Sequence, residues 1–170
     1  FLDTGLFLDQ RPLRKNRAQE AACKKVLNLF CYTGSVTVQA ALGGAKSSLS
    51  VDMSNTYLDW AQRNFLLNGI NTAKHALLRA DALDYLVSEK ERFDIIFLDP
   101  PSFSNSKKMQ DAFDIQRDHP GLIAAAIDRL MPGGTLYFST NKKKFTMDDE
   151  LMEACIAKEI TYLSVHKDFA

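Results

Sequence analysis

The sequence has 170 residues, of which 46% are hydrophobic and 25% charged, so it has the size and balance of one globular domain with a sizeable core. This composition excludes a disordered chain, a collagen-like chain and a disulfide scaffold, and no apolar run approaches the roughly 18 residues of a membrane span. Lysines and arginines number 21 and aspartates and glutamates also 21, so total charge cannot hold nucleic acid and local clusters would have to do so. We expect a cytoplasmic protein with no membrane partner. The three cysteines lack metal-ligand spacing, which predicts free thiols and no metal site.

The apolar segments alternate between short continuous runs and stretches with helical spacing, a pattern typical of βα units around a parallel sheet. We predict strands over residues 26–30, 48–52, 75–81, 93–99, 135–139 and 160–165. We predict helices over 35–42, from a cap at Ser54 to Gly69, over 82–90, over 121–131 behind a cap at Asp118, and from a capping box of Thr146 and Asp149 to Ala157. Residues 1–11 are expected to form an extra strand or hairpin that turns at Thr4 and Gly5.

No repeat or low-complexity linker divides the chain. We therefore expect a short N-terminal β extension with a linker helix over residues 1–25, followed by one domain over 26–170. The fold class is α/β, with a mostly parallel sheet and helices on both faces. Since the sequence lacks an initiator Met and offers no strand to follow 160–165, we expect a piece of a longer protein that stops before its last strand.

Three acidic residues end three successive predicted strands: Asp52, Asp81 and Asp99. Ligands of open parallel sheets bind at the carboxyl ends of the strands, so three acids in register favour a binding site over ordinary turn formation. The turn after the first strand supplies a single glycine, Gly34, where a dinucleotide fingerprint needs three, and no Walker A sequence is present. A pyrophosphate-containing cofactor is therefore disfavoured.

Two segments resemble motifs of class I S-adenosylmethionine-dependent methyltransferases: residues 26–34 are similar to the first motif and residues 99–103 to the fourth. The combination of 5–11, 30–34, 51–54 and 99–107 resembles the C-terminal domain of the K/L family of large-subunit ribosomal RNA methyltransferases. This resemblance covers nearly the whole chain. It implies a Rossmann-like class I methyltransferase fold, S-adenosylmethionine as cofactor, and methylation of guanine N7 in 23S rRNA or its assembly precursor. It also implies THUMP and guanine-N2 methyltransferase domains upstream in the parent chain.

The resemblance implies that Asp52 binds the cofactor ribose and that Asp81 meets the adenine. The cofactor-binding residues predicted in this way are Asn28, Phe30, Tyr32, Thr33, Gly34, Asp52, Met53, Asp81, Ala82 and Asp99. Phe30 and Tyr32 stand where the class has glycines, so we expect a bulky loop whose backbone is less free to take a positive φ. Their rings would form walls around the methionine part of the cofactor, with packing in the core as the alternative.

The target atom follows from what each chemistry needs. Methylation of cytosine C5 requires a positioned thiolate, and residues 138–141 after the fifth predicted strand contain no Cys, which argues against it. Exocyclic amines are methylated by enzymes with an aromatic residue directly after Asp-Pro-Pro; here Ser102 intervenes before Phe103, so this alternative is weakened but stays open. Guanine N7 carries a lone pair and no proton, so it needs orientation and charge stabilisation rather than a general base.

The predicted catalytic residues are Asp99, Pro100, Pro101, Phe103 and Asn141. Asp99 would accept from the guanine edge or balance the developing positive charge, Phe103 would stack on the base or anchor its loop, and Asn141 would orient the base. Because guanine N7 is inaccessible within an A-form helix, the target must be flipped out, and basic loops could hold the phosphates. The predicted RNA-binding residues are Arg11, Lys107, Lys108, Lys142 and Lys143, although a run of charges is also typical of a solvated face. A non-catalytic module that binds cofactor and RNA for a larger enzyme remains the other alternative.

Overall fold

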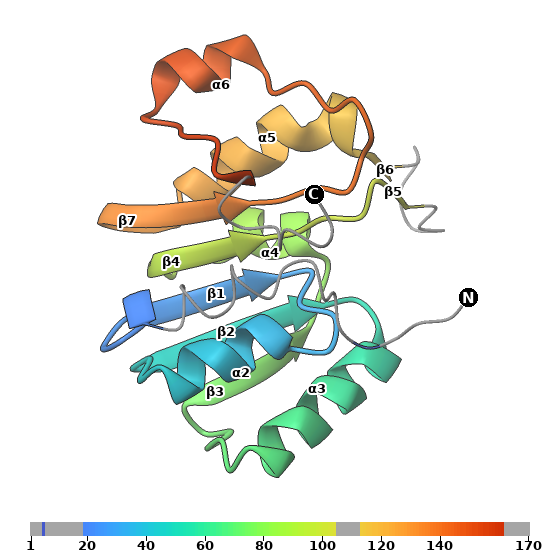
Figure 1. The fold of residues 1–170 in the computed structure, drawn as a ribbon. Helices are drawn as coiled ribbons and strands as arrows, with labels where there is room; N and C mark the ends of the chain where they lie inside the picture. Colours follow the sequence, from blue (N-terminus) through green and yellow to red (C-terminus); the bar gives the residue numbers. More distant parts are fainter. Residues whose placement is uncertain (1–4, 6–18, 105–112, 162–170) are drawn as a thin grey trace.

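The computed structural model describes residues 5, 19–104 and 113–161. Its centre is a five-stranded sheet, all parallel, in the order β3-β2-β1-β4-β7 (Figure 1). The strands are β1 (Lys25–Leu29), β2 (Ser47–Asp52), β3 (His75–Arg79), β4 (Phe93–Leu98) and β7 (Leu130–Phe138). The helices are α2 (Ser35–Leu42), α3 (Asn55–Leu67), α4 (Ala82–Ser88), α5 (Ile115–Ile127) and α6 (Asp149–Ala154). The α/β fold with a parallel sheet is thereby confirmed.

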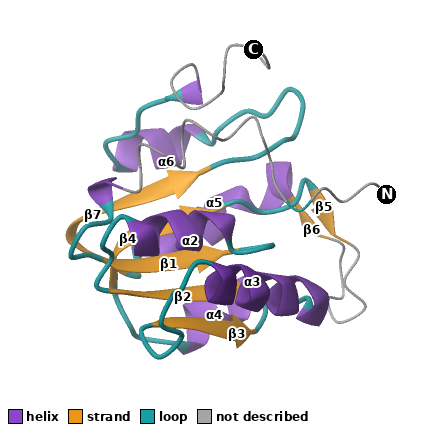
Figure 2. Ribbon diagram, turned by 60° about the horizontal axis from the view of Figure 1, so that its bottom comes forward, coloured by secondary structure: helices purple, strands orange, loops and turns teal. Residues whose placement is uncertain are grey.

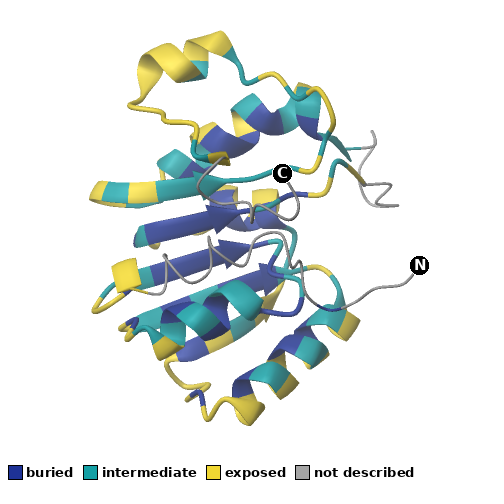
Figure 3. Cartoon of the chain, in the orientation of Figure 1, coloured by how far each residue is buried: buried dark blue, intermediate teal, exposed yellow. Residues whose placement is uncertain are grey.

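Helices cover both faces of the sheet, as the sequence predicts (Figure 2). Successive residues of a strand face opposite sides, so Leu27 of β1 packs into the cluster formed with α4 and α5, while Val26 packs into a second cluster on the side of α2. Residues 95–98 of β4 are all buried, since a central parallel strand is covered on both sides (Figure 3). Because every pairing in the sheet is parallel, the carboxyl ends of its strands lie at the same edge.

The start of α3 is confirmed at its predicted cap, because the Ser54 hydroxyl accepts the N–H of Tyr57 at 3.3 Å. The start of α5 differs from the prediction. Its cap is Asp114, whose carboxylate accepts the N–H of Gln116 at 2.8 Å, so the cap predicted at Asp118 is wrong. Pro120 then lies inside the helix, where it cannot donate to the carbonyl of Gln116. The ring Nδ1 of His119 lies 3.0 Å from that carbonyl oxygen and compensates it.

Two further boundaries differ. Pro132-Gly133-Gly134 does not end a helix, contrary to the prediction from the sequence, but lies within β7, which begins at Leu130. These three residues lie where the pairing of β7 with β4 shifts register, between Phe93 and Ile95. α6 is capped by Asp148, which accepts the N–H of Leu151 at 3.1 Å, and it ends at Ala154. The predicted cap Thr146 is wrong; its backbone instead exchanges two hydrogen bonds with the side chain of Gln116.

A two-stranded antiparallel sheet of β5 (Phe103–Ser104) and β6 (Phe113–Asp114) was not expected from the sequence. Of the strand predicted over 160–165, Ile160 and Thr161 are described and neither is in a strand; the remainder lies outside the described residues. The same holds for the hairpin over 1–11 apart from Gly5. Every helix in the described part of the chain is too short or too polar to cross a membrane.

Candidate functional site

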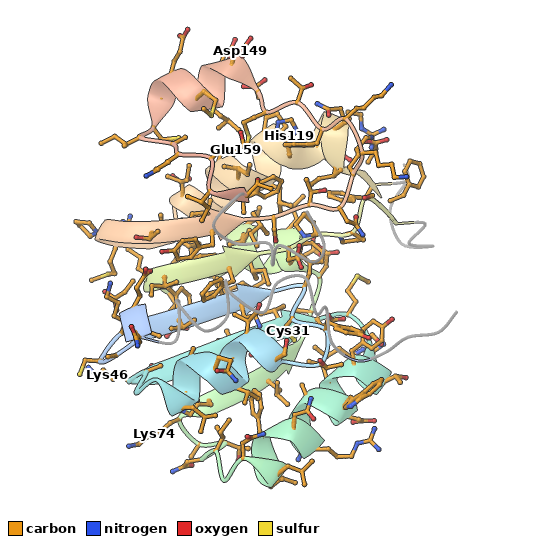
Figure 4. All side chains as sticks on the ribbon, in the orientation of Figure 1. Cys31, Lys46, Lys74, His119, Asp149 and Glu159 are labelled. Atoms are coloured by element: carbon orange, nitrogen blue, oxygen red, sulfur yellow. The ribbon has the colours of Figure 1, made fainter. Side chains whose placement is uncertain are left out.

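The carboxyl ends of all five sheet strands point toward the same edge of the molecule, and the loops that follow them meet there (Figure 1). Strand order reverses between β1 and β4, which is where ligands bind in open α/β sheets. Cys31, directly after β1, lies at this edge, whereas Lys46 and Lys74 lie at the opposite one (Figure 4).

The loop after β1, residues 30–34, has an unusual backbone. Phe30, Tyr32 and Gly34 take positive φ angles of 56°, 52° and 70°. The expectation that side chains at positions 30 and 32 would restrain the loop from this conformation is wrong. A left-handed conformation costs a non-glycine residue about 1–2 kcal/mol, so the surroundings must hold the loop in place.

Asp52, at the end of β2, supplies part of that support. Its Oδ2 accepts the N–H of Tyr32 at 3.0 Å and its Oδ1 accepts the N–H of Ser54 at 2.9 Å. Burial raises the pKa of Asp52, and the backbone hydrogen bonds that it accepts oppose this shift without cancelling it. Each carboxylate oxygen accepts more than one hydrogen bond, so the side chain can support the loop and still bind a ligand.

Gly34 is required by the packing of α3 as well as by its φ. A Cβ at this position would lie 2.9 Å from the Cβ of Ala61 and 3.0 Å from Cε1 of Phe65. Asn64, also on α3, donates its Nδ2–H to the carbonyl of Thr33 at 2.9 Å. The helix therefore lies directly against the loop and fixes it from one side.

Gly5 supports the loop from the other side. Its N–H donates to the hydroxyl of Tyr32 at 2.9 Å, and its carbonyl accepts from the hydroxyl of Thr33 at 2.7 Å. The Tyr32 ring also meets Tyr57 edge-on, with centroids 4.7 Å apart. Gly5 and Asn64 are not predicted from the sequence as supports of the loop. Both contact the loop from distant positions in the chain, so no local sequence pattern indicates these contacts.

Several of the predicted cofactor-binding residues form hydrogen bonds or pack against other side chains of the protein. Asn28 is buried and donates its Nδ2–H to Thr37 at 3.0 Å. Asp81 caps α4, where its Oδ1 accepts the N–H groups of Leu83 and Asp84 at 2.9 and 3.1 Å, and Ala82 is buried in that helix. Met53 is exposed beside Asp52, and Phe30 packs against the larger core cluster. Contacts of these residues with a cofactor stay predictions.

The loops after β4 and β7 are joined side chain to side chain. Ser139 donates its hydroxyl to Oδ1 of Asp99 at 2.6 Å, and Ser102 donates its hydroxyl to Oδ1 of Asn141. Pro100 is buried, whereas Pro101 is exposed and Phe103 is 60% exposed. The structure thus brings the predicted catalytic residues Asp99 and Asn141 to neighbouring loops and leaves an aromatic ring open to solvent beside them.

The predicted RNA-binding residues separate into two groups. Lys142 is half-buried and forms an ion pair with Asp114, with Nζ to Oδ1 at 2.8 Å; the hydrogen bond from Lys142 is the main cause of a lowered pKa at Asp114. Lys143 is exposed. Arg11, Lys107 and Lys108 lie outside the described residues.

None of the three cysteines fits a catalytic thiolate at this edge. Cys31 is buried, and burial together with the negative charge of Asp52 raises the pKa of its thiol. Cys23 precedes β1, at the amino edge, and Cys155 follows α6. The described residues also contain no group of three or more His, Cys, Asp or Glu side chains placed to hold a metal ion.

Comparison with known proteins gives one consistent result. The family model of S-adenosylmethionine-dependent methyltransferases matches residues 2–167. The chain is 55% identical to a protein named ribosomal RNA large subunit methyltransferase K/L from Saccharophagus degradans, covering 99% of the chain and 22% of that protein. It is 57% identical to ribosomal RNA large subunit methyltransferase K from Neisseria meningitidis serogroup B, over 99% of the chain and 49% of the relative. The chain therefore spans half or less of the length of these curated relatives.

Solved structures agree with the sequence comparison. A putative methyltransferase complexed with SAH superposes with a TM-score of 0.75 at 37% identity, over 81% of this chain and 37% of that one. A methyltransferase from Agrobacterium tumefaciens superposes with a TM-score of 0.72 at 28% identity, over 82% and 47% of the two chains. The chain belongs to the S-adenosylmethionine-dependent methyltransferase family.

Proposed function

We propose that this chain transfers a methyl group from S-adenosylmethionine to N7 of a guanine in 23S rRNA or its assembly precursor. The names of the relatives support large-subunit rRNA as substrate. The observation that carries the choice of atom is the pair of joined loops after β4 and β7, where Asp99 and Asn141 are held by neighbouring hydroxyls. None of the three cysteines lies on these two loops, and both described histidines, His75 and His119, are buried and bonded to other groups.

The residues at the carboxyl edge fit the cofactor. S-adenosylmethionine supplies an activated methyl group and carries a ribose whose hydroxyls need acceptors. Asp52 presents a half-buried carboxylate at the end of β2, and we assign the ribose to it. The loop of residues 30–34 follows β1, which lies between β2 and β4, so a cofactor bound at Asp52 and this loop would extend toward Asp99. We assign the adenine to the neighbourhood of Asp81, after β3.

The catalytic residues suit a nucleophile that carries no proton. Because Ser102 donates to the amide oxygen of Asn141, the amide hydrogens of Asn141 are available to an acceptor. The guanine edge that bears N7 also bears the acceptor O6, which matches this donor. The Asp99 carboxylate would balance the positive charge that develops on the methylated ring. Phe103, largely exposed beside them, would stack on the flipped base.

RNA contacts and the wider protein belong to the same proposal. With a net charge of zero, the chain would hold phosphates through local lysines, among which Lys143 is exposed next to Asn141. We further propose a cytoplasmic enzyme whose parent chain carries THUMP and guanine-N2 methyltransferase domains upstream. The length of the relatives is consistent with additional domains.

The test is analysis of the product nucleoside. The full chain is incubated with S-adenosylmethionine and unmodified 23S rRNA, and the RNA is digested to nucleosides. These are separated by chromatography and identified by mass spectrometry. We expect 7-methylguanosine. N2-methylguanosine or N6-methyladenosine would contradict the N7 assignment and identify an exocyclic-amine methyltransferase. Binding of cofactor and RNA without any product in single-turnover reactions would identify a non-catalytic module.

A further inference from the structure

We propose that Gly5 is a positioning residue for the cofactor, because its peptide groups hold the loop of residues 30–34 in the conformation that binds S-adenosylmethionine. The inference rests on the proposed function only in placing the cofactor at this loop. Gly5 precedes Tyr32, a residue of this loop, by 27 positions in the sequence. Gly5 touches the loop and not the reacting atoms, so its role is to position others.

Gly5 forms two hydrogen bonds with the loop through its own peptide groups. Its N–H donates to the Tyr32 hydroxyl at 2.9 Å, and its carbonyl accepts from the Thr33 hydroxyl at 2.7 Å. The bond between Thr33 and Gly5 is buried, and the bond between Gly5 and Tyr32 is partly buried, so loss of either partner is costly. The Thr33 hydroxyl is thus committed to Gly5.

Only glycine fits at position 5 without a shift of its neighbours. Its φ is +74°, and a Cβ would lie 2.5 Å from Cζ2 and 2.8 Å from Cη2 of Trp60. The Trp60 ring lies 6.4 Å from the ring of Tyr32, centroid to centroid, and Tyr57 packs on the other edge of this aromatic group. A methyl group at position 5 must therefore displace Trp60, and the displacement reaches Tyr32.

Tyr32 connects Gly5 with Asp52, the residue assigned to the cofactor ribose. Tyr32 bonds Gly5 through its hydroxyl and Asp52 through its backbone N–H, so one residue with a positive φ joins the two. A non-glycine residue keeps a positive φ only while its surroundings hold it there. Loosening of the contact at Gly5 should therefore disturb the position of Asp52 and of the loop, which the affinity for S-adenosylmethionine reports.

The experiment measures the dissociation constant of S-adenosylmethionine by calorimetry, together with the melting temperature of each variant without ligand. We expect Gly5→Ala to raise the dissociation constant about tenfold or more. Thr33→Val, which keeps the shape and removes the hydroxyl, should raise it several-fold. Gly69→Ala is the matched control: Gly69 also has a positive φ, +65°, but a Cβ there would have nothing within 4 Å, so the affinity of this variant should stay within about twofold.

A rescue experiment separates positioning from general destabilisation. Trp60→Phe removes the ring atoms that a methyl group at position 5 would strike, so the double variant Gly5→Ala/Trp60→Phe should bind the cofactor more tightly than Gly5→Ala alone. A lower melting temperature with unchanged affinity in both Gly5→Ala and Thr33→Val would overturn the proposal, as would an equal loss of affinity in Gly69→Ala. If Gly5→Ala fails to fold, Thr33→Val decides. These measurements use no RNA, so failure to methylate rRNA would contradict the proposed function and leave this inference standing.

Discussion

Asp52 accepts the backbone N–H of Tyr32 at 3.0 Å, so the end of β2 fixes the loop that follows β1. Its other oxygen accepts from Ser54 at 2.9 Å. The two N–H groups bond to different oxygens, so an asparagine, which has an NH2 group in place of one oxygen, loses one of these hydrogen bonds together with the negative charge. We expect Asp52→Asn to raise the dissociation constant of S-adenosylmethionine at least tenfold, while the free energy of unfolding changes by less than about 1 kcal/mol because relief of charge burial offsets the lost bond.

Calorimetry and chemical denaturation check this expectation. Asp59→Asn, on the exposed surface of α3, makes the same chemical change away from the loop and should alter neither quantity. A similar loss of affinity in both variants would show that net charge, and not the placement of Asp52, controls binding.

The affinity for the cofactor should depend on pH through Asp52. Burial raises the pKa of this carboxyl above its ordinary value of 3.8, and the protonated form presents fewer acceptors to the ribose. Affinity should therefore fall, as the pH is lowered from neutrality, at a higher pH than an ordinary aspartate would give. The folded chain holds this proton more tightly than the unfolded chain, so the contribution of Asp52 to stability is present at low pH and is lost as the pH rises through the folded pKa.

Titration of cofactor binding over a series of pH values provides the measurement, with Asp52→Asn as the comparison. The profile of the variant should be flatter in this range. If both proteins lose affinity in parallel, another group is responsible.

Two aspartates at opposite ends of β4 allow effects on catalysis to be separated from effects on stability. Asp99 follows β4 at the site, whereas Asp94, near the amino end of β4, accepts the N–H of Lys25 at 2.8 Å. We expect Asp99→Asn to slow single-turnover methyl transfer about 10²-fold with a smaller effect on cofactor affinity. Asp94→Asn should lower the free energy of unfolding by about 1 kcal/mol and leave the rate of the folded protein unchanged. Equal rates for the two variants would remove Asp99 from the proposed mechanism.

The lysines after β7 should differ in their effect on RNA binding. Lys143 is exposed, so Lys143→Ala should weaken binding of 23S rRNA and reduce the slope of log affinity against log salt concentration by about 1. Lys142 is already paired with Asp114, and Lys142→Ala should change the slope less. Binding measured over a series of salt concentrations tests both. Lys74→Ala, at the opposite edge of the sheet, is the control, and an equal change there would contradict the placement of the RNA (Figure 4).

The sequence predicts best the elements whose signals are local. The buried runs of β1 and β4 and the cap at Ser54 lie close to their predicted positions, because period, burial and capping depend on neighbouring residues. The start of α5 is misjudged because Pro120 favours a first turn, while the structure places it deeper in the helix. There His119 bonds the freed carbonyl through Nδ1 and accepts the N–H of Asp148 through Nε2 at 3.0 Å, a contact 29 residues away.

The loop of residues 30–34 shows the same limit at the site. Intrinsic preference argues against positive φ at Phe30 and Tyr32, yet both adopt it. Tyr32 is held by Asp52 and Gly5, which lie 20 and 27 positions away in the sequence. Long-range hydrogen bonds outweigh the local preference, and a motif alone does not reveal them.

The contact of Gly34 with α3 has a consequence for redesign of the cofactor pocket. A Cβ at position 34 would collide with Ala61 and Phe65 of α3, so the loop and the helix restrict each other's residue types. Among natural sequences, position 34 should therefore stay glycine, and positions 61 and 65 should keep side chains that leave room for the loop. A mutant library intended to accept analogues of the methyl donor should hold position 34 as glycine and vary the other loop residues, because a side chain at 34 stays strained by its φ even when the helix leaves room for it.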